Sequence, residues 1–190
     1  MIPDVRIRDA DVRRKEASMA EADKDMEQRR KECLRKCGVL LAQRDYTCSR
    51  LREKLLSGGF EEEVVESVLE ELREANYLND ERYAQNYVQA HWEDRSRLRI
   101  RMDLESRGVP SEIISEVISA EIQERGSGAE IRQIIKLMRK RGFDPQNATW
   151  EEKNKMQAFL YRKGYGQSSV RTAMNAVMDA ESLDSDGFSV

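Results

Sequence analysis

The chain has 190 residues, of which 36% are charged and 39% hydrophobic, and it contains only 3 prolines. No apolar run reaches the length of a membrane span, and the charged N-terminus lacks a signal-peptide core, so we expect a cytoplasmic protein. A charge-rich chain with so little proline favours helices with narrow apolar stripes.

The three cysteines, Cys33, Cys37 and Cys48, are odd in number, which favours free thiols in a reducing compartment. Cys33 and Cys37 are spaced to share a helix face. A structural metal site normally has four ligands, however, and the single histidine, His91, is distant in sequence. We therefore predict neither a metal nor a cofactor.

Charge is spread unevenly although the net charge is only -3. Residues 60–81 are strongly acidic, residues 82–175 carry an excess of basic side chains, and the end of the chain is acidic again. Such a protein can present basic surfaces without being basic overall.

Residues 1–30 form a charged, helix-prone extension. Within and beyond it, Met19, Met26, Cys33 and Leu40 recur every seven residues. This recurrence predicts that the first helix begins inside the extension.

An internal repeat follows the extension. Three segments align without gaps: LREKLLSGGFEEEVVESVL, IRMDLESRGVPSEIISEVI and MQAFLYRKGYGQSSVRTAM, which begin at Leu51, Ile100 and Met156. Each contains two apolar residues four apart, then a glycine (Gly59, Gly108 or Gly164), a bulky residue and a second apolar stripe. The pattern predicts two helices joined by a turn in which the glycine has a left-handed backbone.

An apolar segment precedes each pair and predicts a third helix per repeat: CLRKCGVLLAQRD, ERYAQNYVQAHW and EIRQIIKLMRKRG. Gly142 is expected to end the last of these segments, and Thr149 with Glu152 has capping-box spacing. The sequence therefore predicts an all-α fold of about nine helices and no sheet. A repeat of about 50 residues buries little surface alone, so we expect an elongated array of three tandem three-helix repeats.

The resulting division has five parts. We predict a helix-prone N-terminal extension, three repeats and an acidic tail, over residues 1–30, 31–78, 79–126, 127–179 and 180–190, and the final SLDSDGFSV is expected to be loose.

Catalytic machinery is not expected. The glycines at 58–59 and 126–128 lack the surroundings of a phosphate-binding loop. His91 lies in line with Tyr83, Tyr87 and Val88 on one helical face, where it is expected to pack. We predict that the protein is not an enzyme and has no catalytic residues.

Two basic faces are the candidate binding sites. The first comprises Arg95, Arg97, Arg99, Arg101 and Arg107. The second comprises Arg132, Lys136, Arg139 and Lys140, opposite an apolar stripe on the same helix. Either face would attract an acidic protein or a phosphate backbone, although each is equally explained as a solvated helix face. The glutamates of 61–74 form an acidic helix that is either solvated or a mimic of DNA.

Four blocks carry a family resemblance, in the same order as in the family. They are LLAQRDYTCSRLREKLLSGGF (40–60), LEELREANYLNDERYAQNYV (69–88), RIRMDLESRGVPSEIISEVI (99–118) and FLYRKGYGQSSVRTAM (159–174). Over about residues 34–178 the chain resembles the RecX family of regulators of the recombinase RecA. Asn79 replaces a frequent aspartate of the family, and Arg50 stands where an acid would complete a capping box with Thr47.

The resemblance implies tandem three-helix repeats, no catalytic centre and binding in the groove of the RecA–DNA filament. It also implies that ATP hydrolysis, strand exchange and repressor cleavage by the filament are damped. We expect a monomer with no membrane association, and a weak affinity for single- or double-stranded DNA stays open. The rival readings are a helix-turn-helix DNA-binding regulator and a helical-repeat scaffold for another partner. The first fits poorly, because the helices after the repeat glycines begin EEE, PSE and GQS.

Overall fold

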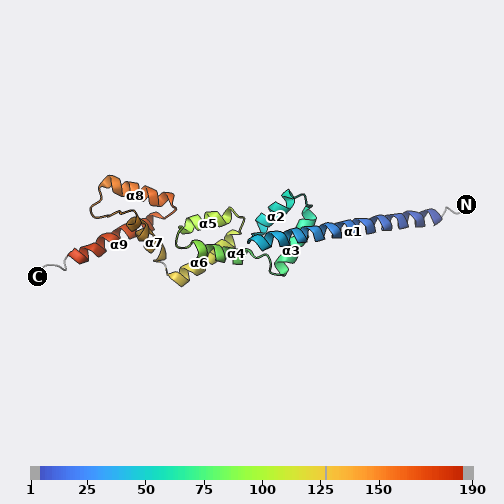
Figure 1. Ribbon diagram of the computed structural model, residues 1–190, viewed down its shortest axis with the longest axis horizontal. Coiled ribbons are helices and arrows are strands. Elements are labelled where there is room, and N and C mark those ends of the chain that lie inside the picture. The colour runs from blue at the N-terminus through green and yellow to red at the C-terminus, as the bar shows by residue number, and fades with distance from the viewer. Residues whose placement is uncertain (1–4, 127, 186–190) are drawn as a thin grey trace. The chain divides into compact units, whose positions relative to one another are not determined.

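The computed structural model describes residues 5–126 and 128–185, and within them it contains nine α-helices and no strand (Figure 1). The helices are α1 (Val5–Gln43), α2 (Cys48–Ser57), α3 (Glu62–Glu74), α4 (Asp80–His91), α5 (Arg97–Glu105), α6 (Ser111–Arg125), α7 (Ala129–Lys140), α8 (Trp150–Arg162) and α9 (Gln167–Ser185). The predicted all-α fold with three helices per repeat is confirmed. No helix among these combines the length and apolar character needed to cross a membrane.

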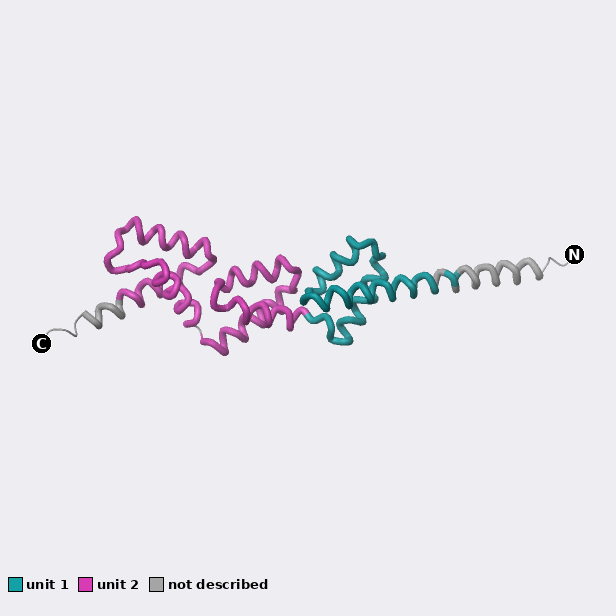
Figure 2. The backbone as a smooth tube through the Cα atoms, in the orientation of Figure 1, with its two compact units in different colours: residues 1–79 teal, residues 80–190 magenta. Residues whose placement is uncertain are grey.

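The chain divides into two compact units, residues 1–79 with α1–α3 and residues 80–190 with α4–α9 (Figure 2). Each repeat has a hydrophobic core of its own, built from its own three helices. The first repeat is therefore the first unit, and the second and third repeats together make the second unit.

The core of the first repeat joins α1 to α3. The apolar stripe of α3 is buried as the sequence predicted, and its members are Val64, Val65, Val68, Leu69 and Leu72. Cys33 and Cys37 of α1 lie fully buried in the same core as free thiols. Burial raises the pKa of both thiols, that of Cys37 to about 12, so both stay protonated at neutral pH.

The repeat glycines close the second helix of each repeat with the same turn. Gly59, Gly108 and Gly164 have φ values of 87°, 74° and 87°. The residue after each glycine donates its N–H to the carbonyl five positions earlier, which closes a six-residue turn. The three bonds are Phe60 to Leu55, Val109 to Leu104 and Tyr165 to Leu160. This is a Schellman turn, which satisfies carbonyls that the helix end leaves without partners.

Other helix ends follow their local sequences. Gly142, with φ of 63°, follows the end of α7 as predicted, and Asn76, with φ of 58°, makes the same kind of turn after α3. The predicted capping box at the start of α8 is present, since Thr149 and Glu152 each accept a backbone hydrogen bond from the other. Thr47 caps α2 through the Arg50 N–H, without a reciprocal acid.

The two long terminal helices both run into segments that the sequence placed outside the repeats. Helix α1 begins at Val5, so the prediction that the first helix starts inside the extension is confirmed. Helix α9 continues to Ser185, so it extends into the predicted acidic tail over residues 180–185. Helix-favouring alanine and glutamate there continue α9 without a stop signal. Residues 186–190 lie outside the described part of the chain.

Buried polar groups join the second and third repeats within the second unit. The Ser96 hydroxyl, which caps α5, donates to the Lys163 carbonyl at the end of α8 over 2.8 Å. The Gln133 amide donates to the Trp92 carbonyl, and its oxygen accepts from the Tyr165 hydroxyl over 3.5 Å. These bonds satisfy groups that would be costly to bury alone. Ser96 links the start of α5 to the end of α8, and Gln133 links α7 to the end of α4.

Candidate binding surfaces on the second and third repeats

Asp103 is the centre of the arginine-rich surface of the second repeat. Its side chain lies on α5 and the residue is only 8% exposed. Arg95 pairs with its Oδ2, the Arg99 Nε lies 3.2 Å from its Oδ1, and the Tyr87 hydroxyl donates to Oδ2 over 3.1 Å. A buried carboxylate is stable only when it is paired and hydrogen-bonded, so Asp103 draws these groups together.

The ionisation of Asp103 follows from the same contacts. Burial on its own would raise the pKa of this carboxyl, but hydrogen bonds from Arg95 and Tyr87 and the charge of Arg99 outweigh it, and the pKa lies below its ordinary value. The carboxylate is therefore charged at neutral pH and holds both guanidinium groups in place.

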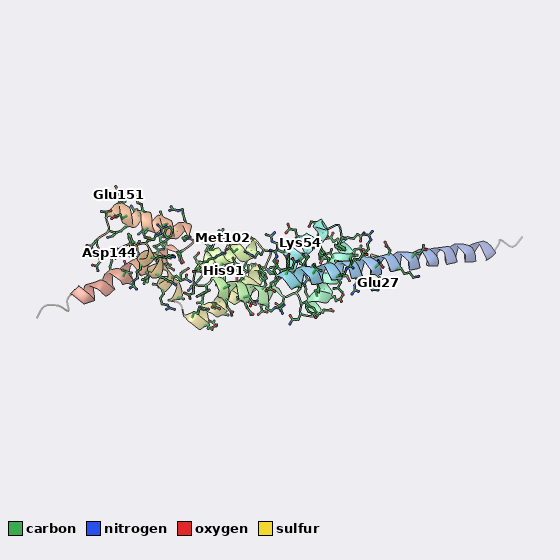
Figure 3. The ribbon with its side chains drawn as sticks, viewed as in Figure 1. Glu27, Lys54, His91, Met102, Asp144 and Glu151 are labelled. Carbon is green, nitrogen blue, oxygen red and sulfur yellow. The ribbon has the colours of Figure 1, made fainter. Side chains whose placement is uncertain are left out.

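Tyr87 holds the third arginine of the cluster. The Arg107 guanidinium lies 4.5 Å from the centre of the Tyr87 ring and donates to the Asp103 carbonyl oxygen. The His91 ring, labelled in Figure 3, packs on the same tyrosine with the ring centres 4.3 Å apart. Burial, and then the charges of Arg95 and Arg107, lower the pKa of His91, so its imidazole is neutral at pH 7. His91 packs, as the sequence suggested.

The remaining two arginines of this set have other neighbours. Arg97 lies over the Trp92 ring, 5.7 Å from its centre. Arg101 donates to the Ser115 hydroxyl of α6 over 3.2 Å. The structure thus brings together Arg95, Arg99 and Arg107, and it places Arg97 and Arg101 beside them on separate contacts.

The outward face of α5 also carries apolar side chains that the sequence reasoning missed. Leu98 is 53% exposed and Met102, which Figure 3 labels, is 51% exposed, whereas Ile100 and Leu104 are buried. The sequence contained enough information to predict these exposed side chains, because a helix cannot place residues 98, 100, 102 and 104 on one face. Two of the four apolar residues in that alternation had to face outward.

The basic set of the third repeat has a different character. Arg132, Lys136, Arg139 and Lys140 are all exposed on α7, while Ile134 and Met138 of the same helix are buried. Among the side chains that the structure describes, none of the four forms an ion pair, in contrast to Arg95 and Arg99. Beside them a groove of about 400 Å³ is lined by Glu93, Arg125, Ala129, Arg132, Gln133 and Lys136.

The acidic helix α3 is largely neutralised by arginines of its own unit. Glu61 lies 3.3 Å from Arg29, Glu71 pairs with Arg30, and Glu62 and Glu66 both pair with Arg52. These pairings favour the hypothesis that α3 is a solvated surface helix over the hypothesis that it mimics DNA. Across the described residues, no group of three or more histidine, cysteine or acidic side chains is placed to hold a metal ion.

The fold defines a class: an all-α protein of tandem three-helix repeats. Family models described as the first, second and third three-helix domains of RecX match residues 33–72, 79–118 and 129–174. The chain belongs to the RecX family of regulatory proteins.

Individual relatives agree with the family models. The chain is 36% identical over 136 residues to the regulatory protein RecX of Trichlorobacter lovleyi, a match that covers 70% of this chain and 86% of the relative. It is 30% identical over 137 residues to RecX of Caldanaerobacter subterraneus, covering 72% of this chain and 66% of the relative.

Solved structures share the fold. The crystal structure of RecX from Lactobacillus salivarius matches with a TM-score of 0.66 and 17% identity, over 82% of this chain and 97% of that one. A second crystal structure of a regulatory protein RecX matches with a TM-score of 0.69 and 21% identity, over 83% of this chain and 77% of that one.

Proposed function

We propose that this protein is a regulator that binds the RecA–DNA filament and lowers its ATP turnover, and with it strand exchange and stimulated repressor cleavage. The observation that carries the proposal is the ordered match of all three repeats to the three domains of one regulatory family. The protein acts by binding rather than by catalysis, as a cytoplasmic monomer.

The exposed basic side chains of α7 are the proposed electrostatic contact of this function. They are Arg132, Lys136, Arg139 and Lys140, and they are not engaged in ion pairs within the described residues. An acidic filament surface would attract such a face, and each exposed ion pair would contribute under about 1 kcal/mol. The contact therefore depends on several residues together, and it weakens as salt screens the charges.

The test is ATP hydrolysis by RecA on single-stranded DNA, with the protein titrated in. We expect wild-type protein to lower turnover, and simultaneous replacement of the four α7 residues by glutamate to abolish most of this effect. The matched control replaces four other exposed basic residues by glutamate, with the same change in net charge: Arg35, Lys36, Lys54 and Arg162.

The outcomes separate the activity from the surface. Wild-type protein that leaves turnover unchanged at micromolar concentration contradicts the proposed function. If the control variant loses inhibition as fully as the α7 variant, the proposal that α7 is the contact surface is contradicted. The loss would then be a general effect of net charge. Circular dichroism and melting temperatures of both variants establish that they are folded.

A further inference from the structure

We propose that the outward face of α5 is a second docking surface, which fits a protein partner presenting an apolar depression bordered by carboxylates. The surface consists of Leu98, Arg99 and Met102, with Arg95 and Arg101 at its edge. This inference rests on the proposed function, because it assigns the apolar part of the filament contact to α5, and it goes beyond the charge-based contact on α7.

Exposed apolar side chains at the centre of the face are the first support. Leu98 and Met102 are four residues apart, so they lie one above the other on the same face of α5. Single exposed hydrophobic residues are common, but an adjacent pair ringed by charged groups marks an interaction surface. Methionine adapts its shape to a partner, which suits it to such a position.

The arginines around the pair are held in place before any partner arrives. Asp103 lies on the inner side of α5 and fixes both Arg95 and Arg99, yet the Arg99 side chain remains 58% exposed. Ordering such a side chain in advance removes part of the entropy cost of binding. Arginine is enriched among the residues that contribute most to binding at protein interfaces.

Two repeats contact each other beneath this face. The Ser96 hydroxyl caps α5 and is hydrogen-bonded to Lys163 at the end of α8. A Cβ placed on Gly164 would lie 3.6 Å from the Cβ of Leu98, so the turn after α8 abuts the first turn of α5. The second and third repeats therefore support the surface jointly.

The chemistry of the face selects a protein over a nucleic acid. A phosphate backbone offers nothing to bury Leu98 and Met102, which are half-exposed, whereas an apolar depression in a protein surface does. The arginines complement carboxylates, which they bind with two parallel hydrogen bonds. The occupant is thus an acidic protein surface with an apolar centre.

The experiment measures the affinity of the full-length protein for RecA assembled on single-stranded DNA. Because both side chains are exposed, Leu98→Ser together with Met102→Ser should leave the melting temperature near the wild-type value. The double variant should bind about tenfold more weakly or worse, with an unchanged dependence on salt. Arg99→Gln should also weaken binding, and it should reduce the dependence on salt.

The matched control is Val39→Ser together with Trp150→Ser, which removes apolar side chains of 54% and 77% exposure from other helices. Equal loss of affinity in this control would overturn the α5 site in favour of general surface stickiness. Unchanged affinity of the Leu98/Met102 variant, with wild-type binding intact, would overturn the α5 site and leave the proposed function standing. Absence of wild-type binding would overturn both. A Leu98/Met102 effect of the same size on single-stranded DNA without RecA would identify nucleic acid as the occupant, and would equally overturn the inference.

Discussion

Asp103 shows how one buried acid orders a basic surface. Its carboxylate receives Arg95 from the α4–α5 loop, Arg99 from its own helix and the hydroxyl of Tyr87 from α4. The pairing with Arg99, four residues earlier, was readable from helical spacing. The pairing with Arg95 and Tyr87 was not, because it depends on how α4 packs against α5. The arginines could therefore be named from the sequence, while their arrangement could not.

The turn glycines permit a comparison between two positions with the same backbone. Gly59 and Gly164 both have φ of 87°, but a Cβ on Gly59 would meet no atom within 4 Å, whereas one on Gly164 would lie 2.6 Å from the Ser96 hydroxyl oxygen. Gly59→Ala should therefore cost only the backbone strain, about 1 kcal/mol in the free energy of unfolding. Gly164→Ala should cost about 1–2 kcal/mol more, since Ser96 must rotate away from its hydrogen bonds.

Denaturant unfolding of the two variants, followed by circular dichroism, measures the difference. A Gly164→Ala variant no less stable than Gly59→Ala would show that Ser96 does not contribute at this position. The control is Ser96→Ala with and without Gly164→Ala. Once the obstructing oxygen is gone, the added cost of Gly164→Ala should fall to about that of Gly59→Ala.

At the scale of the helices, the ends of individual helices could be predicted from the sequence better than the contacts between repeats. The glycine turns and the Thr149 capping box depend on residues within a few positions of each other, so the local sequence specifies them. Gln133 gave no such signal. Its amide is buried on the apolar side of α7. A polar side chain is accommodated there because it donates a hydrogen bond to the Trp92 carbonyl, across the junction between the second and third repeats.

Tyr165 makes this junction sensitive to alkali. Burial, and then repulsion from Glu130 and Asp94, raise the pKa of Tyr165 to about 12 from 10.0. The folded state thus favours the neutral phenol more than the unfolded state does. This contribution to the stability of the fold is complete below pH 10 and is lost as the pH rises towards 12. A difference of this size corresponds to about 2–3 kcal/mol.

Unfolding free energies measured between pH 9 and 12 test this sign and size. Tyr165→Phe should be less stable at neutral pH by about 1 kcal/mol, through the lost hydrogen bond to Gln133, and should lose less stability above pH 10. Much of the dependence should remain in Tyr165→Phe, because the pKa of Cys37 is raised further, from 9.0 to about 12. Tyr161→Phe, at an exposed position, is the control, and an equal flattening there would contradict the role of Tyr165.

For the molecule as a whole, the repeat was the informative signal in the sequence. The third repeat is longer than the second, yet its extra residues fall before the shared skeleton, in the α7–α8 connection and the first turn of α8. The turn glycine, the buried seam and the final helix keep their register. Sequence alignment of the chain with itself therefore predicted three repeats in spite of the insertion.

The stacking of the repeats into an elongated array is a separate prediction. A compact globule of this length would have a radius of gyration of about 16 Å. Small-angle scattering of dilute protein should give a clearly larger value, because a repeat array contacts only its neighbours. A measured radius at the compact limit would contradict the array.

Having one core per repeat has a consequence for synthesis on the ribosome. The helix pairs with extensive contacts, such as α1 with α3, α4 with α6 and α7 with α9, all lie within single repeats. Each core is thus completed by a contiguous stretch of chain, and the first can close while the third is still untranslated. The nascent chain should bury the apolar side chains of each repeat as that repeat is synthesised. Few apolar side chains then stay exposed until a distant segment has been made.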